Sequence, residues 1–422
     1  MTSVAFQEDD LAGYGNPLPQ AILAMKVLIV SFYYPPEMGA APSRISNMAE
    51  GLRRQGADVE VLTCLPNYPK GRIFEGYRHR LSAKEVVNGI TVYRYWTYAT
   101  VSRNAVARLA GMLIFAMAIW LFALHVSRVK SYNRIIIQSP PLLVAFSATL
   151  LFGCIYRRAT ILNVSDLWPL SAVELGAVKA GSIYCGVLSW MERFVYRNSR
   201  AIQGQSRAIL DHIAALGFSK PHFLYLNLQP HSAATDSQPP AGREPLMLVY
   251  AGLLGVAQDV LGIIENIDFK AIGAQLHIFG GGNQAASIEE YARSHDSGVF
   301  CHGYKSKDEI NRVLGAYHAS IVPLTVSIKG AVPSKIFDLL PHGTPILYAG
   351  GGEGEQIISS YGLGFVSAPG DFDALRSNIM KMKNLSEADY AQLRMNCRET
   401  SKGVFSFDQQ MSKYSQFLLN LC

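Results

Sequence analysis

Short apolar segments that end in glycine or proline turns recur along the chain, and they constrain its fold more than any other feature. Lys26–Phe32 ends in a Pro-Pro turn, and the helical pattern of Arg44–Gln55 closes on Gly56 before a second apolar run, Ala57–Thr63. Runs this short and continuous are typical of strands buried on both faces. Strand, helix and strand make a βαβ unit, and repeated units form a doubly wound parallel sheet.

The alternation occurs in two separate parts of the chain. Arg134–Gln138 leads through an apolar helix to Thr160–Val164, and after a polar stretch four more strands are expected at Met247–Tyr250, Leu276–Phe279, Ser320–Pro323 and Pro345–Tyr348. The 422 residues exceed what one core usually holds. We therefore predict an α/β fold with a disordered extension over 1–24 (or a true start at Met25), a Rossmann-like domain over 25–228, a linker over 229–244, a second Rossmann-like domain over 245–405, and a helix over 406–422 that packs back on the first domain.

Charge is distributed unevenly. Residues 26–210 hold 22 Lys and Arg against 9 Asp and Glu, a net charge of +13, whereas residues 211–422 hold 16 against 20. A basic and apolar first half favours an anionic surface as partner, such as phospholipid headgroups or a lipid diphosphate. Because the chain lacks the motifs of nucleic-acid readers, we expect no nucleic-acid partner.

Leu109–Leu124 is a run of sixteen residues without a charge, and basic residues flank it at Arg103, Arg108, Arg128 and Lys130. A helix that spans a membrane needs about 20 apolar residues. The pattern favours a helix lying in the membrane interface, so that the protein is peripheral or monotopic. A buried helix covering the sheet is the alternative, and it is favoured for the second apolar run, Leu142–Tyr156.

Metal binding is not predicted. The six cysteines have no C-x-x-C spacing, which indicates free thiols in a reducing compartment. The single Asp-x-Asp, Asp371 to Asp373, follows Pro-Gly and precedes a helical pattern, so we interpret it as a helix N-terminus.

Several motifs together carry a family resemblance: Tyr33–Ala40 followed by Arg44, then Asp166–Pro169, then Pro333–Lys335 with Asp338 and Gly343–Pro345. In this order they resemble family 4 of the glycosyltransferases, and within it the WbuB-type branch that builds O-antigen, capsule and exopolysaccharide. The resemblance implies the GT-B fold, in which two Rossmann-like domains face a central cleft. It also implies a metal-independent, retaining transfer from a nucleotide-sugar, expected to be a UDP-sugar, to a saccharide linked to a polyprenyl diphosphate lipid. Such an enzyme would work at the cytoplasmic face of the inner membrane.

In the first domain, the turn after the first strand is a candidate acceptor or phosphate site. Glu37 is a catalytic candidate, because it would place a carboxylate at the sheet edge where open α/β sheets bind ligands. Gly39 would allow close approach, and Arg44 could bind an anion. Asp166 ends a later strand and would stabilise positive charge in the transition state. A solvated or helix-terminal charge in a tight turn is the alternative for Glu37, and a helix N-cap is the alternative for Asp166. Glu174 is a weaker candidate.

In the second domain, two glycine turns follow strands and offer backbone amides to a nucleotide, with Gly252 and Gly255 in the first and Gly280 and Gly282 in the second. The resemblance places the base near Gly303 and Tyr304, the ribose on Asp338, and the diphosphate near Ser334 and Lys335. A cation there would stabilise a departing diphosphate, so Lys335 is the leading catalytic candidate. A solvated lysine at a helix start is the alternative.

The chain also departs from the family pattern. Gly330 stands where many members have a glutamate, and Leu253 and Gln258 stand where many have Arg and Lys. Phosphate charge must then be met by Lys335, Lys329 or Arg44. The glycine-rich segment 350–355 could cap phosphates or form a surface loop. A sugar-nucleotide epimerase of the same fold and a catalytically silent scaffold subunit remain alternative functions.

Overall fold

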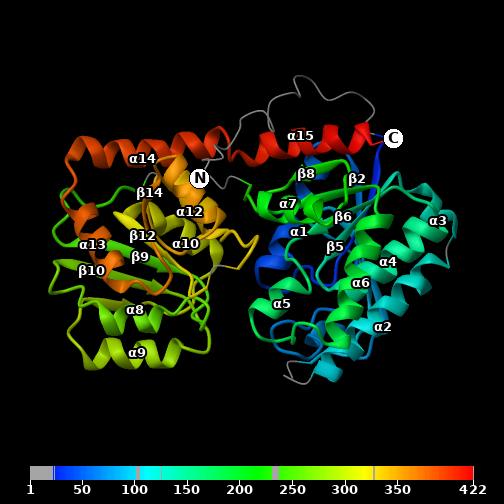
Figure 1. The fold of residues 1–422 in the computed structure, drawn as a ribbon, viewed down its shortest axis with the longest axis horizontal. Coiled ribbons are helices and arrows are strands. Elements are labelled where there is room, and N and C mark those ends of the chain that lie inside the picture. Colours follow the sequence, from blue (N-terminus) through cyan, green and yellow to red (C-terminus); the bar gives the residue numbers. More distant parts are fainter. Residues whose placement is uncertain are drawn as a thin grey trace. The chain divides into compact units, whose positions relative to one another are not determined.

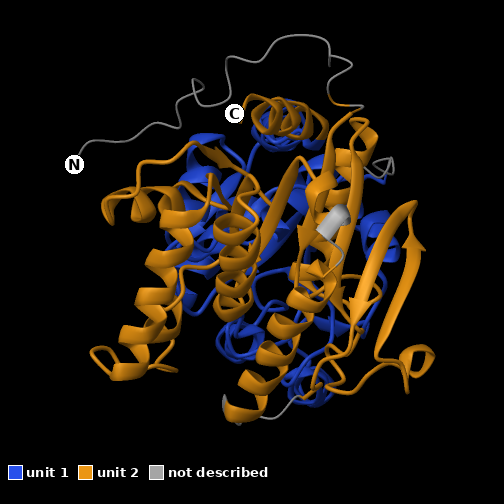
Figure 2. Ribbon diagram, turned by 90° about the vertical axis from the view of Figure 1, so that its right-hand side faces the viewer, with its two compact units in different colours: residues 1–10, 228–407 blue, residues 11–227, 408–422 orange. Residues whose placement is uncertain are grey.

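The computed structural model describes residues 22, 24–100, 105–124, 126–230, 237–326 and 328–421. Nearly all of the expected N-terminal extension and part of the expected linker lie outside these residues. The chain divides into two compact units, which Figure 2 colours separately. We call them the N-terminal unit, which comprises the described residues up to 227 together with the last helix from residue 408, and the C-terminal unit, residues 228–407.

The N-terminal unit is built on an eight-stranded sheet. All neighbouring strands are parallel except β3, which pairs antiparallel with β4. In spatial order the strands are β3 (Ser82–Val87), β4 (Ile90–Tyr95), β2 (Asp58–Cys64), β1 (Lys26–Val30), β5 (Arg134–Ser139), β6 (Thr160–Val164), β7 (Ala201–Gly204) and β8 (His222–Leu224). Because the strand order reverses direction at β1, the loops after β1 and β5 frame the position where such sheets bind ligands.

Helices cover both faces of this sheet (Figure 1). They are α1 (Ala40–Arg54), α2 (Ala105–Ala123), α3 (Val126–Ser131), α4 (Leu142–Ala148), which continues as a π-helical segment (Thr149–Ile155), α5 (Leu170–Glu174), α6 (Ile183–Asn198), α7 (Arg207–Ala215) and α15 (Phe407–Asn420), with a short 3-10 turn at Glu75–Tyr77. Helix α15 joins the unit through buried contacts: the Tyr414 hydroxyl donates to Gln203, and the Gln410 side chain bonds the backbone of Leu226.

Helix α2 has two unlike sides. Phe115 and Phe122 are fully buried, and their rings lie 5.6 Å from Phe32 and 5.2 Å from Tyr93 respectively, so this side belongs to the core of the sheet. On the other side Met117 is 60% and Leu121 57% exposed. The helix is long and apolar enough to span a membrane, but its inner side belongs to the core of the N-terminal unit.

The C-terminal unit contains a six-stranded parallel sheet in the order β11 (Val299–Cys301), β10 (Ala274–Phe279), β9 (Leu246–Ala251), β12 (Ala319–Pro323), β13 (Ile346–Ala349) and β14 (Gly364–Ser367). Its helices are α8 (Val260–Asn266), α9 (Ala285–Ser294), α10 (Lys307–Val313), α11 (Lys335–Leu339), α12 (Glu353–Ser360), α13 (Phe372–Lys383) and α14 (Glu387–Lys402), with 3-10 turns at Leu314–Ala316 and Leu340–His342. The order reverses at β9, so the loops after β9 and β12 frame the second expected ligand position.

The predicted strands are present within one or two residues of their expected bounds. The prediction for the first helix was wrong at its start, since α1 begins at Ala40 rather than Arg44. Gly39 adopts a φ of 136° at the N-cap, and Pro42 is tolerated because a residue in the first turn needs no backbone N–H donor. The β3–β4 hairpin was not predicted.

Candidate active site

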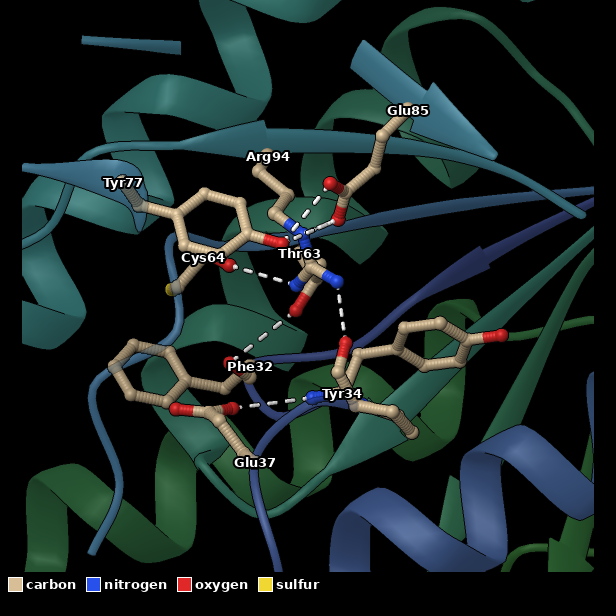
Figure 3. Close-up of polar contacts among 9 residues, drawn as sticks. Phe32, Tyr34, Glu37, Thr63, Cys64, Tyr77, Glu85 and Arg94 are labelled. Carbon is tan, nitrogen blue, oxygen red and sulfur yellow. Dashed lines mark hydrogen bonds and ion pairs between the residues drawn. The ribbon is translucent and has the colours of Figure 1, made fainter. Parts of the chain in front are cut away.

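Glu37 lies in the loop after β1, where it joins two loops of the N-terminal unit. Its buried carboxylate accepts hydrogen bonds from three backbone amides, those of Tyr34 at 3.2 Å, Asn67 at 2.9 Å and Tyr68 at 2.8 Å. Figure 3 shows the first of these bonds. Burial raises the pKa of Glu37, while these amide bonds and Arg94 oppose the shift. The solvated-turn alternative is therefore wrong, and the geometry favours a role in holding the loop over one in proton transfer.

The opposite charges of Arg44 and Asp166 interact at the same edge of the sheet. Arg44 comes from α1 and Asp166 follows β6, and burial lowers the pKa of Arg44 to about 10 while Asp166 and Tyr225 oppose that shift. The buried Nε of Arg44 has no hydrogen-bond partner among the described residues. A buried guanidinium with an unused donor is suited to bind an anionic oxygen.

Asp166 keeps solvent access, as expected for a group that meets a ligand. The surrounding chain nevertheless removes part of the water around the carboxylate, and this desolvation raises the pKa of Asp166, while Arg44 and the Ser165 hydroxyl oppose the shift. The N-cap alternative is wrong, because α5 begins after Pro169 and has no side-chain cap. Glu174 lies exposed at the end of α5, which gives it no comparable setting.

Lys335 is the candidate catalytic cation of the C-terminal unit. It begins α11, and its ammonium donates to the Tyr250 hydroxyl at 2.9 Å while lying 4.1 Å from the centre of the Tyr250 ring. A Cβ atom on Gly252 would lie 2.3 Å from Cε and 2.4 Å from Nζ of Lys335. Glycine at position 252 therefore admits the ammonium to the carboxyl end of β9, and the solvated-lysine alternative is wrong.

The environment of Lys335 weakens its hold on a proton. Burial lowers the pKa of Lys335 to about 8, and the negative charge of Asp338 opposes the shift. Asp338 lies one helical turn further along α11, where burial raises its pKa and Lys307 and Lys335 oppose the shift. Ser334, Lys335 and Asp338 thus lie together in the first turn of α11.

The glycine turns after β9 and β10 pack against each other. Gly252 donates its amide to Phe279 and Leu254 donates to Gly281, both at 2.9 Å. A Cβ on Gly280 would lie 1.9 Å from the Gly252 carbonyl oxygen, and one on Gly282 would lie 2.2 Å from that of Leu254. Close loop packing therefore explains Gly280 and Gly282. The expectation that the amides of Gly252 and Gly280 serve a nucleotide is wrong, because both are already bonded within the unit.

A row of stacked rings at β10 and β11 was not predicted. His302 stacks on Phe279 with centroids 4.4 Å apart, and its Nε2 lies 2.9 Å from Nδ1 of His277. The row adjoins Gly303, whose carbonyl accepts from Gly280 at 2.9 Å, and the exposed Tyr304. The alternating aromatic and apolar residues of 277–279 and 300–302 were the available signal.

The positions that depart from the family pattern also have physical explanations. Gly330 has a φ of 85°, a conformation that a glutamate would adopt only under strain. Leu253 is exposed, and Lys335 instead supplies the cation at the end of β9. Gly350 and Gly354 pack on the Tyr348 ring, and α12 begins at Glu353, so the glycine-rich segment is an ordered turn into a helix.

Within the described ranges, no three His, Cys, Asp or Glu side chains are grouped so that they could hold a metal ion. The interpretation of Asp371 is confirmed, since it caps α13 by accepting from the Ala374 amide at 2.9 Å. Asp373 pairs with Arg376. The five described cysteines are free thiols.

The matching family and the relative found by sequence are both described as glycosyl transferases. The family described as "Glycosyl transferase 4-like domain" matches residues 39–227. The chain is 25% identical over 284 residues to the colanic acid biosynthesis glycosyl transferase WcaI of Escherichia coli K12, covering 64% of this chain and 69% of WcaI.

Solved structures share the fold at low sequence identity. Anabaena HepE, in complex with UDP and glucose, has a TM-score of 0.65 at 14% identity, covering 92% of this chain and 99% of HepE. WaaG, a glycosyltransferase involved in lipopolysaccharide biosynthesis, has a TM-score of 0.62 at 12% identity, covering 93% and 99%.

Proposed function

Since this chain is a glycosyltransferase with the GT-B fold and a glycosyl transferase 4-like domain, we propose that it transfers a sugar from a UDP-sugar to a lipid-linked saccharide. The pathway would be one that builds a cell-surface polysaccharide, as the names of WcaI and WaaG suggest for those proteins. O-antigen, capsule and exopolysaccharide are the polymers that the family branch makes. The observation that carries the proposal is the Lys335 ammonium at the carboxyl end of β9.

Lys335 would stabilise the diphosphate as it leaves. The charge on UDP grows when the bond to the sugar breaks, and a fixed cation in a half-buried site stabilises that charge more than it would in water. Tyr250 and Gly252 hold the ammonium in place before the donor binds. Such preorganisation avoids a reorganisation cost during the reaction.

The remaining donor groups surround this cation. Asp338 would accept hydrogen bonds from the two ribose hydroxyls, and Ser334 would contact the diphosphate. Gly303 and Tyr304 would lie next to the base. HepE was solved with UDP and glucose, which supports a UDP-linked donor for a chain with the same fold. The proposed donor site needs no metal ion, because Lys335 supplies the positive charge.

The acceptor would bind at the N-terminal unit. Gly39 leaves the start of α1 open, and the unpartnered Nε of Arg44 could bind a phosphate oxygen of a polyprenyl diphosphate. Asp166 would contact a sugar hydroxyl or stabilise the positive charge that develops at the anomeric carbon. Both groups lie at the ligand-binding edge of their sheet.

Retention of the anomeric configuration is part of the hypothesis. The acceptor hydroxyl would attack the anomeric carbon on the face from which UDP departs, while the bond from that carbon to the phosphate oxygen breaks. The electron pair goes to the diphosphate, whose oxygen takes the acceptor proton. This path asks of the protein only positioning and charge stabilisation.

Membrane attachment would occur through the N-terminal unit at the cytoplasmic face of the inner membrane. The outer side of α2 exposes Leu113, Met117 and Leu121, and α6, beyond the intervening α4, exposes Val187 and Trp190. Because the inner side of α2 is core, the helix would lie in the interface rather than cross the bilayer. The net charge of +13 over residues 26–210 complements anionic lipids.

A thermal-shift screen over UDP-, GDP- and dTDP-sugars tests the donor assignment. We expect a UDP-sugar at about 100 times its Kd to raise the Tm of the wild type by about 5 °C or more, with a much smaller rise for Lys335→Met. Arg376→Met is the control, since Arg376 pairs with Asp373 on the surface of α13. If no UDP-sugar shifts the Tm, a silent scaffold becomes the better interpretation, and UDP release without acceptor would favour an epimerase.

A further inference from the structure

We propose that Arg94, together with Glu85, is a positioning residue that fixes the loop Tyr33–Gly39 for acceptor binding. The inference rests on the proposed function of that loop, and it assigns a task to a buried charge that the reaction itself does not use. Arg94 lies on β4, the strand that pairs with the edge strand β3. Its side chain is fully buried.

The Arg94 guanidinium connects three segments of the N-terminal unit (Figure 3). Nη2 donates to the Pro35 carbonyl in the loop, Nη1 donates to the Cys64 carbonyl at the end of β2 at 3.4 Å, and Nε donates to Glu85 on β3. Glu85 in turn accepts from the Tyr77 hydroxyl. One side chain thus joins the edge hairpin to the loop after β1.

The loop combines buried residues that anchor it with exposed residues that are accessible to a ligand. Tyr34 and Glu37 are buried, whereas Pro36, Met38 and Gly39 are exposed. Arg94 holds the loop by the Pro35 carbonyl, and Glu37 holds it by the Tyr34 amide while also binding the amides of the loop after β2. One anchor is the positively charged Arg94 and the other is the carboxylate of Glu37, and each bonds a backbone group of the loop. The exposed residues of the loop are thereby held in one position for a ligand.

A buried guanidinium is costly unless its donors are satisfied, and an apolar side chain would often give more stability. Arginine provides what a lysine could not, because its planar fork reaches two carbonyls and a carboxylate at once in fixed directions. Precise positioning of a reacting group is worth much in rate, since a misplacement of about 1 Å can cost about 100-fold. The arrangement is therefore better explained by loop geometry than by stability.

Arg134 offers a matched control in the same unit. It begins β5, so it lies at the opposite, amino-terminal edge of the sheet, and its guanidinium also donates to backbone carbonyls, those of Leu418, Leu419 and Leu421. Arg94→Ala and Arg134→Ala should both lower stability. Only Arg94→Ala should disturb the loop.

The experiment measures transfer from the UDP-sugar found by the screen to farnesyl-diphosphate-linked N-acetylglucosamine. For Arg94→Ala we expect kcat/KM for the acceptor to fall about 100-fold, with the affinity for UDP unchanged and with partial rescue by methylguanidinium. Arg134→Ala should keep the wild-type acceptor kinetics. Equal acceptor kinetics in the two variants, or no response to methylguanidinium, would overturn the proposal.

Amide hydrogen exchange provides a readout that needs no activity, so failure of the proposed function and failure of this inference can be told apart. The amides of Tyr33, Tyr34 and residues 37–39, together with those of residues 67–68, should exchange faster in Arg94→Ala than in Arg134→Ala. If Arg94→Ala does not fold, Glu85→Gln weakens the same anchor at a partly exposed position and should have the same, smaller effects. Unchanged exchange of these amides in the folded variant would contradict the inference.

Discussion

At the scale of single residues, the proposed chemistry depends on how Lys335 is held. Tyr250 positions the ammonium, Gly252 leaves room for it, and Asp338 keeps a negative charge nearby. Lys335 and Tyr250 are 85 positions apart in the sequence, so the fold brings the ammonium to the carboxyl end of β9.

The pKa of Lys335 makes the rate depend on pH. Because burial lowers this pKa to about 8, the ammonium should lose its proton as the pH rises through about 8. We expect kcat/KM for the donor to fall above that pH, since this quantity reports the free enzyme. Lys335→Arg, whose charge persists, should be slower but should lack the alkaline fall. An identical alkaline fall in Lys335→Arg would show that another group titrates.

The sequence predicted Lys335 through the family resemblance, and it predicted Asp166 and Arg44 because one follows a predicted strand and the other begins a predicted helix. The sequence could not show that Glu37 bonds three backbone amides or that Arg94 is buried behind it. Those facts depend on contacts between residues about 30 to 60 positions apart. Local patterns carry no information about such pairs.

At the scale of elements, the proposed membrane contact rests on the exposed side of α2. Vesicle co-sedimentation should show binding of the wild type to phosphatidylglycerol vesicles and weaker binding to phosphatidylcholine vesicles. Replacing Met117 and Leu121 by serine removes exposed apolar side chains, each worth about 1.5 kcal/mol or more when buried in lipid. We therefore expect vesicle affinity to fall at least about 10-fold.

The control for α2 is Met395→Ser, which alters a comparably exposed apolar residue on α14 of the C-terminal unit. Its vesicle binding should match that of the wild type. Wild-type affinity in the Met117→Ser, Leu121→Ser variant would remove α2 from the membrane contact. Self-association that the double variant abolishes would point to a second copy of the chain as the partner.

Strands were easier to predict than the hairpin at the edge of the sheet. Buried parallel strands are continuous apolar runs, so β1, β6 and β13 stand out in the sequence. In the edge strand β3, half of the residues are polar, and exposed and partly buried residues alternate. Its turn, Asn88-Gly89, with φ values of 50° and 77°, is a typical hairpin signal that sequence reasoning missed.

At the scale of the whole molecule, the two units should respond differently to acid. Burial lowers the pKa of four histidines of the C-terminal unit: His277, to about 4, and His302, His318 and His342. The unfolded chain binds protons on these groups near pH 6.5, whereas the folded unit does not. Its free energy of unfolding should therefore decrease as the pH falls from 7 to 5. In the N-terminal unit, burial raises the pKa of Glu192 to about 7, which acts in the opposite direction.

Urea unfolding at pH 7 and pH 5 checks this expectation. His277→Phe keeps a ring against Phe300, on which His277 stacks with centroids 5.0 Å apart, and removes the titrating group. The loss of stability between the two pH values should be smaller in the variant than in the wild type. An equal loss in both proteins would mean that His277 binds its proton equally well in the folded and unfolded chains.

The most direct test of the central claim is a transfer assay with a UDP-sugar and a polyprenyl-diphosphate-linked saccharide, followed by NMR of the product. The claim is that the chain moves a sugar with retention, using Lys335 to stabilise the departing UDP. We expect UDP release that requires the acceptor, a product with the anomeric configuration of the donor, and a rate about 100-fold lower in Lys335→Met. A product with inverted configuration, or a Lys335→Met variant as fast as the wild type, would contradict the claim.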